Sequence, residues 1–118
     1  MASFLVIVHS DHYANQSSRS ALEFAKAAIA NKHQVAAVFF YQQGVLHASN
    51  SADVPSDELD TRQGFIKLKE QHNVELLVCV TAAEKRGTAS SHHPDFTIAG
   101  LAEMAGISNE VDRIVQFK

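Results

Sequence analysis

Apolar residues are distributed along this chain in two alternating patterns. In the first pattern, short continuous runs are rich in β-branched and aromatic side chains and contain few polar residues. Such runs are typical of strands that are covered on both faces of a sheet. We therefore expect strands at Phe4–Val8, Val35–Tyr41, Glu75–Val80 and Arg113–Phe117.

The second pattern places apolar residues three and four positions apart, which is the spacing of one face of a helix. It predicts a helix over Ser17–Asn31, with a buried face formed by Ala21, Leu22, Ala25, Ala28 and Ile29. Pro55 and the acidic residues after it form a helix-start signal, and this helix is expected to run to about His72. The polar segment between the second strand and this helix, Gln42–Val54, is expected to be a loop.

A third helix is predicted over Phe96–Ala105, followed by Gly106 as a stop signal. Its inward-facing residues are expected to be Ile98, Leu101 and Met104. The segment Thr81–Gly87 is long enough for one short helical turn.

Strands that alternate with helices predict parallel βαβ units with right-handed crossovers. We expect a three-layer α/β/α sandwich on a mostly parallel sheet, with residues 1–118 forming a single domain. In such sheets the functional site lies beyond the carboxyl ends of the strands. The loops at that edge begin at His9, Tyr41 and Val80, which directs attention to Cys79 at the end of the third strand.

Composition and charge narrow the class of protein. With 118 residues and a 46% hydrophobic composition, the chain can bury a core of its own. A net charge of −3 gives no basic field for phosphates, which argues against direct high-affinity nucleic-acid binding. The single cysteine excludes an internal disulfide, and no leader or membrane-spanning stretch is recognisable. These features predict a cytoplasmic protein that is not bound to a membrane.

Cys79 is the candidate for chemistry. A helical turn that follows it would point backbone N–H groups toward the thiol, and helix N-termini and nearby cations lower the pKa of cysteine thiols. The nearest cations in sequence are Lys85 and Arg86. A thiolate can accept the outer sulfur of an incoming persulfide and later give it to another thiolate, which needs one cysteine in each partner.

Other interpretations of Cys79 must be weighed. A lone cysteine in an apolar strand is more often a small core residue, and Val78 and Val80 on either side leave the direction of its side chain open. A phosphatase loop would need arginine where Lys85 stands. A thioredoxin-type site would need a second cysteine.

Five histidines invite a metal-site hypothesis: His9, His12, His47, His92 and His93. Their loops could converge at one end of the sheet, but adjacent histidines in polar loops are usually solvated and no H-x-x-x-H pair is present. We therefore predict no metal. His9 or His12 as a base that assists Cys79 stays a hypothesis. Without a P-loop or G-x-G-x-x-G motif, no nucleotide cofactor is predicted either.

Several segments, in order along nearly the whole chain, resemble the DsrE/TusD family of sulfurtransferases, with the closest likeness to its TusD members. They are Val38–Val45, Pro55–Asp60, Val78–Gly87, Phe96–Ala105 and Asp112–Phe117. The resemblance implies that Cys79 carries a persulfide and that the fold is the sandwich expected above.

The resemblance also implies partners. TusD-like proteins work in a heterohexamer with TusB-like and TusC-like subunits, take sulfur from a TusA-like donor and pass it on with a TusE-like acceptor toward 2-thiouridine in tRNA. Two alternatives remain: a non-catalytic structural subunit of such a complex, and a DsrE-type protein of sulfur oxidation. One departure from the family is the segment Thr88–Asp95, which is shorter than the insertion usual in TusD-like chains. The resemblance therefore does not define the docking surface or the exact partner.

Overall fold

The computed structural model describes residues 1–11, 16–49, 61–89 and 92–118, and a parallel sheet lies at its centre. The strands are β1 (Ser3–Val8), β2 (Gln34–Phe40), β3 (Glu75–Cys79), β4 (Thr97–Ala99) and β5 (Arg113–Phe117). Their order across the sheet is β4-β3-β2-β1-β5, and every neighbouring pair of these strands is parallel. The four strands predicted from the apolar runs are confirmed, to within two residues at each end.

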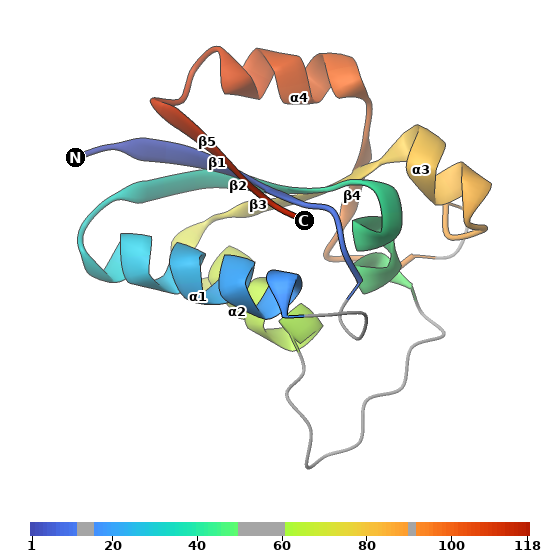
Figure 1. Cartoon of the computed structure of the whole chain (residues 1–118), viewed down its shortest axis with the longest axis horizontal. Helices are drawn as coiled ribbons and strands as arrows, with labels where there is room; N and C mark the ends of the chain where they lie inside the picture. The colour runs from blue at the N-terminus through green and yellow to red at the C-terminus, as the bar shows by residue number, and fades with distance from the viewer. Residues whose placement is uncertain (12–15, 50–60, 90–91) are drawn as a thin grey trace.

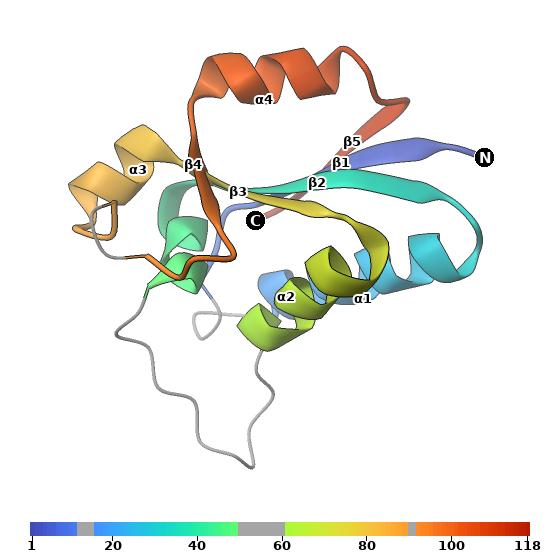
Figure 2. The same cartoon turned by 180° about the vertical axis from the view of Figure 1, so that it is seen from behind.

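Helices cover both faces of the sheet (Figures 1 and 2). One face carries α1 (Ser17–Ala30) and α2 (Thr61–His72), while α4 (Leu101–Ser108) lies over the other face. The short helix α3 (Val80–Lys85) continues directly from β3, and the 3-10 helix η1 (Gln42–Ala48) lies next to it at the carboxyl end of the sheet. This arrangement confirms the three-layer α/β/α sandwich. None of the helices in the described ranges is long and apolar enough to cross a membrane.

The core is thickest between the sheet and the α1–α2 layer. Phe40 packs edge-on against Phe65 of α2 with ring centroids 5.2 Å apart, and Phe4 packs in the same way against Phe24 of α1, also at 5.2 Å. Four of the five predicted apolar positions of α1 are buried, and Ile29 is half-buried. The packing between the sheet and α4 is less extensive, because no residue of α4 is buried.

The predicted helix over Phe96–Ala105 is wrong in its first part. Thr97–Ala99 is strand β4, which pairs with β3 through Leu77↔Thr97 and Cys79↔Ala99. Backbone hydrogen bonds to β3 therefore override the local helical spacing of the apolar residues. The helix begins at Leu101, so Ile98 belongs to the strand, and Leu101 is 48% exposed instead of facing inward.

Two further differences concern the end of the last helix and the segment that was expected to be a loop. Helix α4 runs through Gly106 to Ser108, so Gly106 is not its stop signal. Helix η1 occupies the first half of the segment that was expected to be a loop. The predicted helix start at Pro55 lies outside the described residues, and the predicted end at His72 is confirmed.

Gly44 allows η1 to pack against the carboxyl end of β1. Its N–H donates to the carbonyl oxygens of Tyr41 at 2.8 Å and His9 at 3.2 Å. A Cβ atom at this position would lie 2.2 Å from the carbonyl oxygen of Val8, which real Cβ atoms do not approach so closely. The backbone of β1 cannot yield as a flexible side chain would, so the close approach requires glycine.

We predict that Gly44→Ala destabilises the protein by about 1–3 kcal/mol, the usual cost of forcing extra atoms into a packed site. Gly106→Ala is the matched control, because nothing lies within 4 Å of its added Cβ. There alanine should stabilise the helix by up to about 1 kcal/mol. Urea unfolding followed by circular dichroism measures both free energies, and equal stability of the two variants would contradict the close packing of η1 on β1.

Candidate functional site

Cys79 is the last residue of β3 and immediately precedes the first turn of α3. Its backbone is extended (φ −62°, ψ 121°), and the helix begins at Val80 with no loop between the two elements. The short helical turn expected after the cysteine is therefore present and starts one residue earlier than expected. This direct junction fixes the backbone of Cys79 from both sides.

The sheet register decides which way the side chain of Cys79 points. Val78 pairs with Phe40, whose ring contacts Phe65 of α2, so Val78 lies on the α1–α2 face. Successive side chains of a strand point to opposite faces. Cys79 therefore points toward the layer that contains α3 and α4, which the sequence pattern had left open.

Cys79 lines a pocket of about 290 Å³ at the carboxyl edge of the sheet. The other lining residues come from three separate parts of the chain: Tyr41, Gln42, Thr81, Ala82, Lys85, Arg86 and Leu101. Cys79 is 1% exposed, so its side chain belongs to the inner wall of this pocket. A reagent that reaches the sulfur must pass the outer lining residues.

The charged side chains of the pocket are both cations. Arg86 is held by its Nε, which donates to Oε1 of Gln43 at 2.8 Å, and by a second bond to the carbonyl oxygen of Ala82 at 3.2 Å. Lys85 is exposed, and its ammonium group has no partner among the described residues. Two cations without a carboxylate favour an anionic sulfur species in the pocket.

His9 lies close to this pocket but does not line it. Its Nδ1 is 3.2 Å from Oε1 of Gln42, and its Nε2 is 2.9 Å from Oε1 of Gln116 on β5. Its ring also packs against Tyr41, with centroids 5.7 Å apart. His9 is thus connected to the pocket through Gln42 and Tyr41, whereas His12 lies outside the described residues.

The other histidines have structural surroundings. His47 is fully buried, donates from Nδ1 to the carbonyl oxygen of Gly44 at 2.9 Å, and packs on the rings of Phe40 and Phe65. His93 accepts a hydrogen bond at Nδ1 from the backbone N–H of Asp95 at 3.1 Å. Across the described residues, no group of three or more His, Cys, Asp or Glu side chains is arranged to hold a metal ion.

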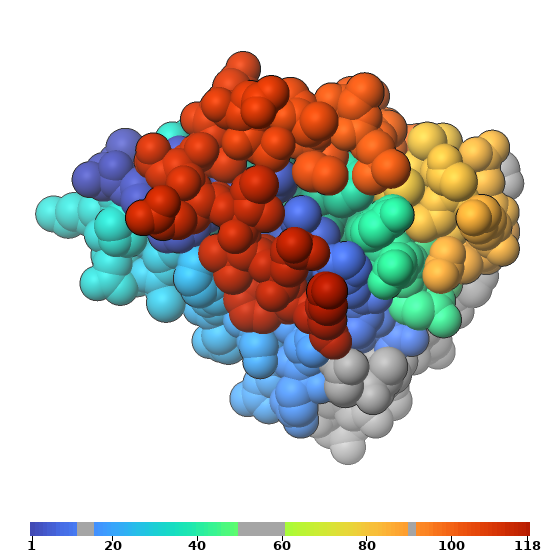
Figure 3. Space-filling model, turned by 45° about the horizontal axis from the view of Figure 1, so that its top comes forward, coloured from blue at the N-terminus to red at the C-terminus, as the bar shows by residue number. Residues whose placement is uncertain are grey.

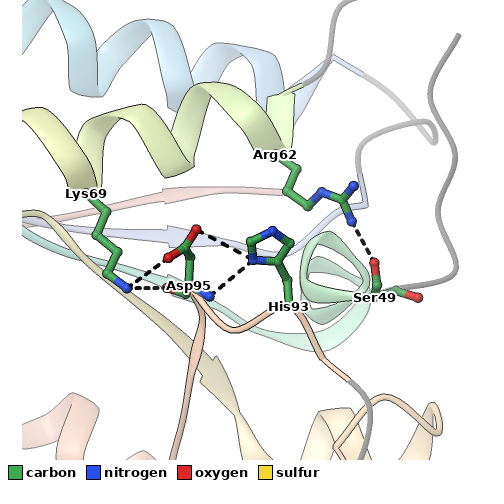
Figure 4. A network of polar contacts seen from close by, with 5 residues as sticks. All are labelled: Ser49, Arg62, Lys69, His93 and Asp95. Atoms are coloured by element: carbon green, nitrogen blue, oxygen red, sulfur yellow. Dashed lines mark hydrogen bonds and ion pairs between the residues drawn. The ribbon is translucent and has the colours of Figure 1, made fainter.

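Residues 92–96, which precede β4, are attached to η1 and α2, and Figure 4 shows the contact of Asp95 with Lys69 of α2. The backbone N–H of His93 donates to the carbonyl oxygen of Ala48 at 2.7 Å, and Ser49 and His92 form an isolated antiparallel β-bridge. Lys69 of α2 donates to the carbonyl oxygen of Asp95 at 3.1 Å. These contacts hold the strand β4 in place and, through it, the start of α4 at the pocket.

Sequence reasoning missed part of the pocket wall. Thr81 and Ala82 follow Cys79 directly, so their position in α3 is a local signal that was available. Leu101 gave no such signal, because its place at the pocket depends on β4 pairing with β3 before the helix begins. Tyr41 and Gln42 were expected at the same edge of the sheet, but not as a wall beside Cys79.

Comparison with known proteins gives a consistent family assignment. The sequence model of the DsrE/DsrF-like family matches residues 2–117. "Sulfurtransferase TusD" of Serratia proteamaculans (strain 568) is 36% identical over 129 aligned positions, covering 99% of this chain and 100% of that protein. "Sulfurtransferase TusD" of Pectobacterium atrosepticum is 37% identical with the same coverage. Because these alignments are longer than the 118 residues of this chain, both relatives contain residues without a counterpart here.

A solved structure shares the fold. The ychN protein from E. coli superimposes with a TM-score of 0.86 at 21% sequence identity, and the match covers 99% of this chain and 100% of that chain. At this level of identity the likeness concerns the arrangement of strands and helices alone.

We predict that Leu101→Ala accelerates alkylation of Cys79 by iodoacetamide severalfold, because the truncation opens the wall of the pocket and less local opening is then needed to reach the sulfur. Ile114→Ala is the matched control, since Ile114 is 47% exposed, against 48% for Leu101, but does not line the pocket. Mass spectrometry over time gives the alkylation rate. Equal acceleration in both variants would indicate general loosening of the α4 side.

Proposed function

This chain belongs to the DsrE/DsrF-like family, and on that premise we propose that it carries sulfur as a persulfide on Cys79. The observation that carries the proposal is the position of the chain's single cysteine, on the inner wall of a pocket whose charged lining residues are both cations. The carboxyl edge of a parallel sheet is where such folds place their working groups.

The protein is a sulfurtransferase of a sulfur relay. This follows from its relation over its full length to two proteins named sulfurtransferase TusD, at 36% and 37% identity. A relay passes sulfur between proteins, so the chain acts together with other proteins. The chemistry needs no resident cofactor, since one thiol in each partner is sufficient.

We derive the transfer step at Cys79 from the exchange chemistry of sulfur. The thiolate of Cys79 attacks the outer sulfur of a persulfide on the donor, and a new Sγ–S bond forms. The S–S bond of the donor breaks, and its electron pair leaves with the donor's inner sulfur, which takes up a proton as a thiol. No oxidant or reductant is consumed, because one persulfide and one thiol become one thiol and one persulfide.

Release is the reverse step with another protein. The thiolate of the acceptor attacks the outer sulfur of the Cys79 persulfide, and the Sγ–S bond breaks with its electron pair returning to Cys79. Lys85 and Arg86 provide positive charge near the anionic sulfur in both steps. Both steps use the sulfur of Cys79 and no second cysteine of this chain.

The finer assignment of partners comes from the family resemblance. We propose a TusA-like donor, a TusE-like acceptor and TusB-like and TusC-like subunits in a heterohexamer, serving 2-thiolation of the tRNA wobble uridine. A pathway of sulfur oxidation is the alternative for the same chemistry. The alignments with the curated relatives support the first choice, since both relatives carry the name TusD.

A non-catalytic structural subunit is the second candidate function. The observation that favours it is the burial of Cys79, which is 1% exposed in the isolated chain. In this case the cysteine is a core residue of β3, and another subunit of the complex carries the sulfur.

We predict that Cys79→Ser folds normally and loses persulfide loading entirely, because serine fits the space but its hydroxyl cannot accept the outer sulfur. The protein is incubated with a cysteine desulfurase, cysteine and a small sulfur-carrier protein, and intact mass is then measured without reductant. The wild type should gain one sulfur atom that dithiothreitol removes. Full sulfur transfer by a complex assembled with Cys79→Ser would favour the structural subunit instead.

A further inference from the structure

The outer wall of the Cys79 pocket is the surface that any sulfur-exchanging protein must touch. Thr81 and Lys85 are exposed and lie one helical turn apart on α3, and Leu101 stands at the start of α4. In the space-filling view, η1, α3 and the beginning of α4 meet on one face of the molecule, in green, yellow and orange (Figure 3). We define the docking surface as Thr81, Lys85, Arg86 and Leu101.

Loading and release of sulfur impose the same geometry on this surface. In each step three sulfur atoms are arranged in a line during the displacement: the partner's sulfur, the transferred sulfur and Sγ of Cys79. The backbone of Cys79 is fixed by β3 on one side and α3 on the other. The partner's sulfur must therefore occupy the same position when it gives sulfur and when it takes sulfur.

The charge of the docking surface is opposite to that of the whole chain. The chain has a net charge of −3, whereas Lys85 and Arg86 are the charged lining residues of the pocket. Arg86 is already held by Gln43 and the carbonyl oxygen of Ala82, so its position does not depend on a partner. Beside them Leu101 offers an apolar contact that is 48% exposed. Such a surface is complementary to an acidic segment with an apolar residue.

We infer that the sulfur donor and the sulfur acceptor dock on this one surface in turn, and that each presents its cysteine on a segment that carries acidic residues. The inference rests on the proposed persulfide role of Cys79 and adds how partners are recognised and in what order. Two proteins cannot occupy the surface together, so transfer is a two-step exchange in which the donor leaves before the acceptor binds.

Charge recognition is tested with two persulfidated cysteine peptides, one with glutamates and one with lysines around the cysteine. At low ionic strength, the acidic peptide should load Cys79 about tenfold faster than the basic one, within the range of electrostatic steering. Near 1 M salt, where the screening length is about 3 Å, the difference should largely vanish.

The charge-reversal variant Lys85→Glu should lose the preference for the acidic peptide. Lys67→Glu is the matched control, because it changes the net charge equally from an exposed position on α2, on the opposite face of the sheet. It should keep the preference of the wild type. An unchanged preference in Lys85→Glu, with the fold verified by circular dichroism, would overturn the charge recognition.

The shared surface is tested with an acidic peptide in which serine replaces cysteine. This peptide should inhibit loading by a persulfidated peptide and release to a thiol peptide with the same inhibition constant. Inhibition of only one step would overturn the shared surface. Peptide loading that is equal in the wild type and Cys79→Ser would instead contradict the proposed function itself, so the two failures are distinguishable.

Discussion

Parallel hydrogen bonding of β3 with strands on both sides is the constraint on which the candidate site depends. Pairing with β2 places Val78 beside Phe40, and pairing with β4 places Cys79 beside Ala99. The register therefore sets both the position of Cys79 along the strand direction and the face of the sheet toward which its side chain points. Because α3 follows without a loop, the cysteine has no flexible segment that could carry it elsewhere.

The two faces of the sheet are packed unequally, and this difference gives the protein both stability and an accessible side. Phe40 of β2 packs against the buried Phe65 of α2, and Phe4 of β1 packs against the half-buried Phe24 of α1. On the other face α4 has no buried residue and Leu101 remains half-exposed. The pocket next to Cys79 lies on this less densely covered face, where another protein can approach without displacing the main core.

Burial of Cys79 and its proposed role in sulfur transfer are compatible. A persulfide is reactive toward many thiols, and a side chain that is 1% exposed is shielded from those that do not bind to the pocket. Of the two cations at the pocket, Arg86 is held in place by its hydrogen bond to Gln43 within the chain itself. The four described histidines of the candidate metal site, His9, His47, His92 and His93, form no common centre: His47 is a core residue and His9 is held between two glutamines.

Strands β1, β2, β3 and β5, the α/β class and the place of Cys79 at the carboxyl edge could be predicted from the sequence, because continuous apolar runs and their order are local properties of the chain. That Thr97–Ala99 is a strand became evident from the folded structure, since this conformation depends on hydrogen bonds to β3 rather than on apolar spacing. The same holds for the direction of the Cys79 side chain. The pocket wall combines Tyr41, Lys85 and Leu101, residues distant in sequence whose meeting follows from strand order and register, which no local pattern contains.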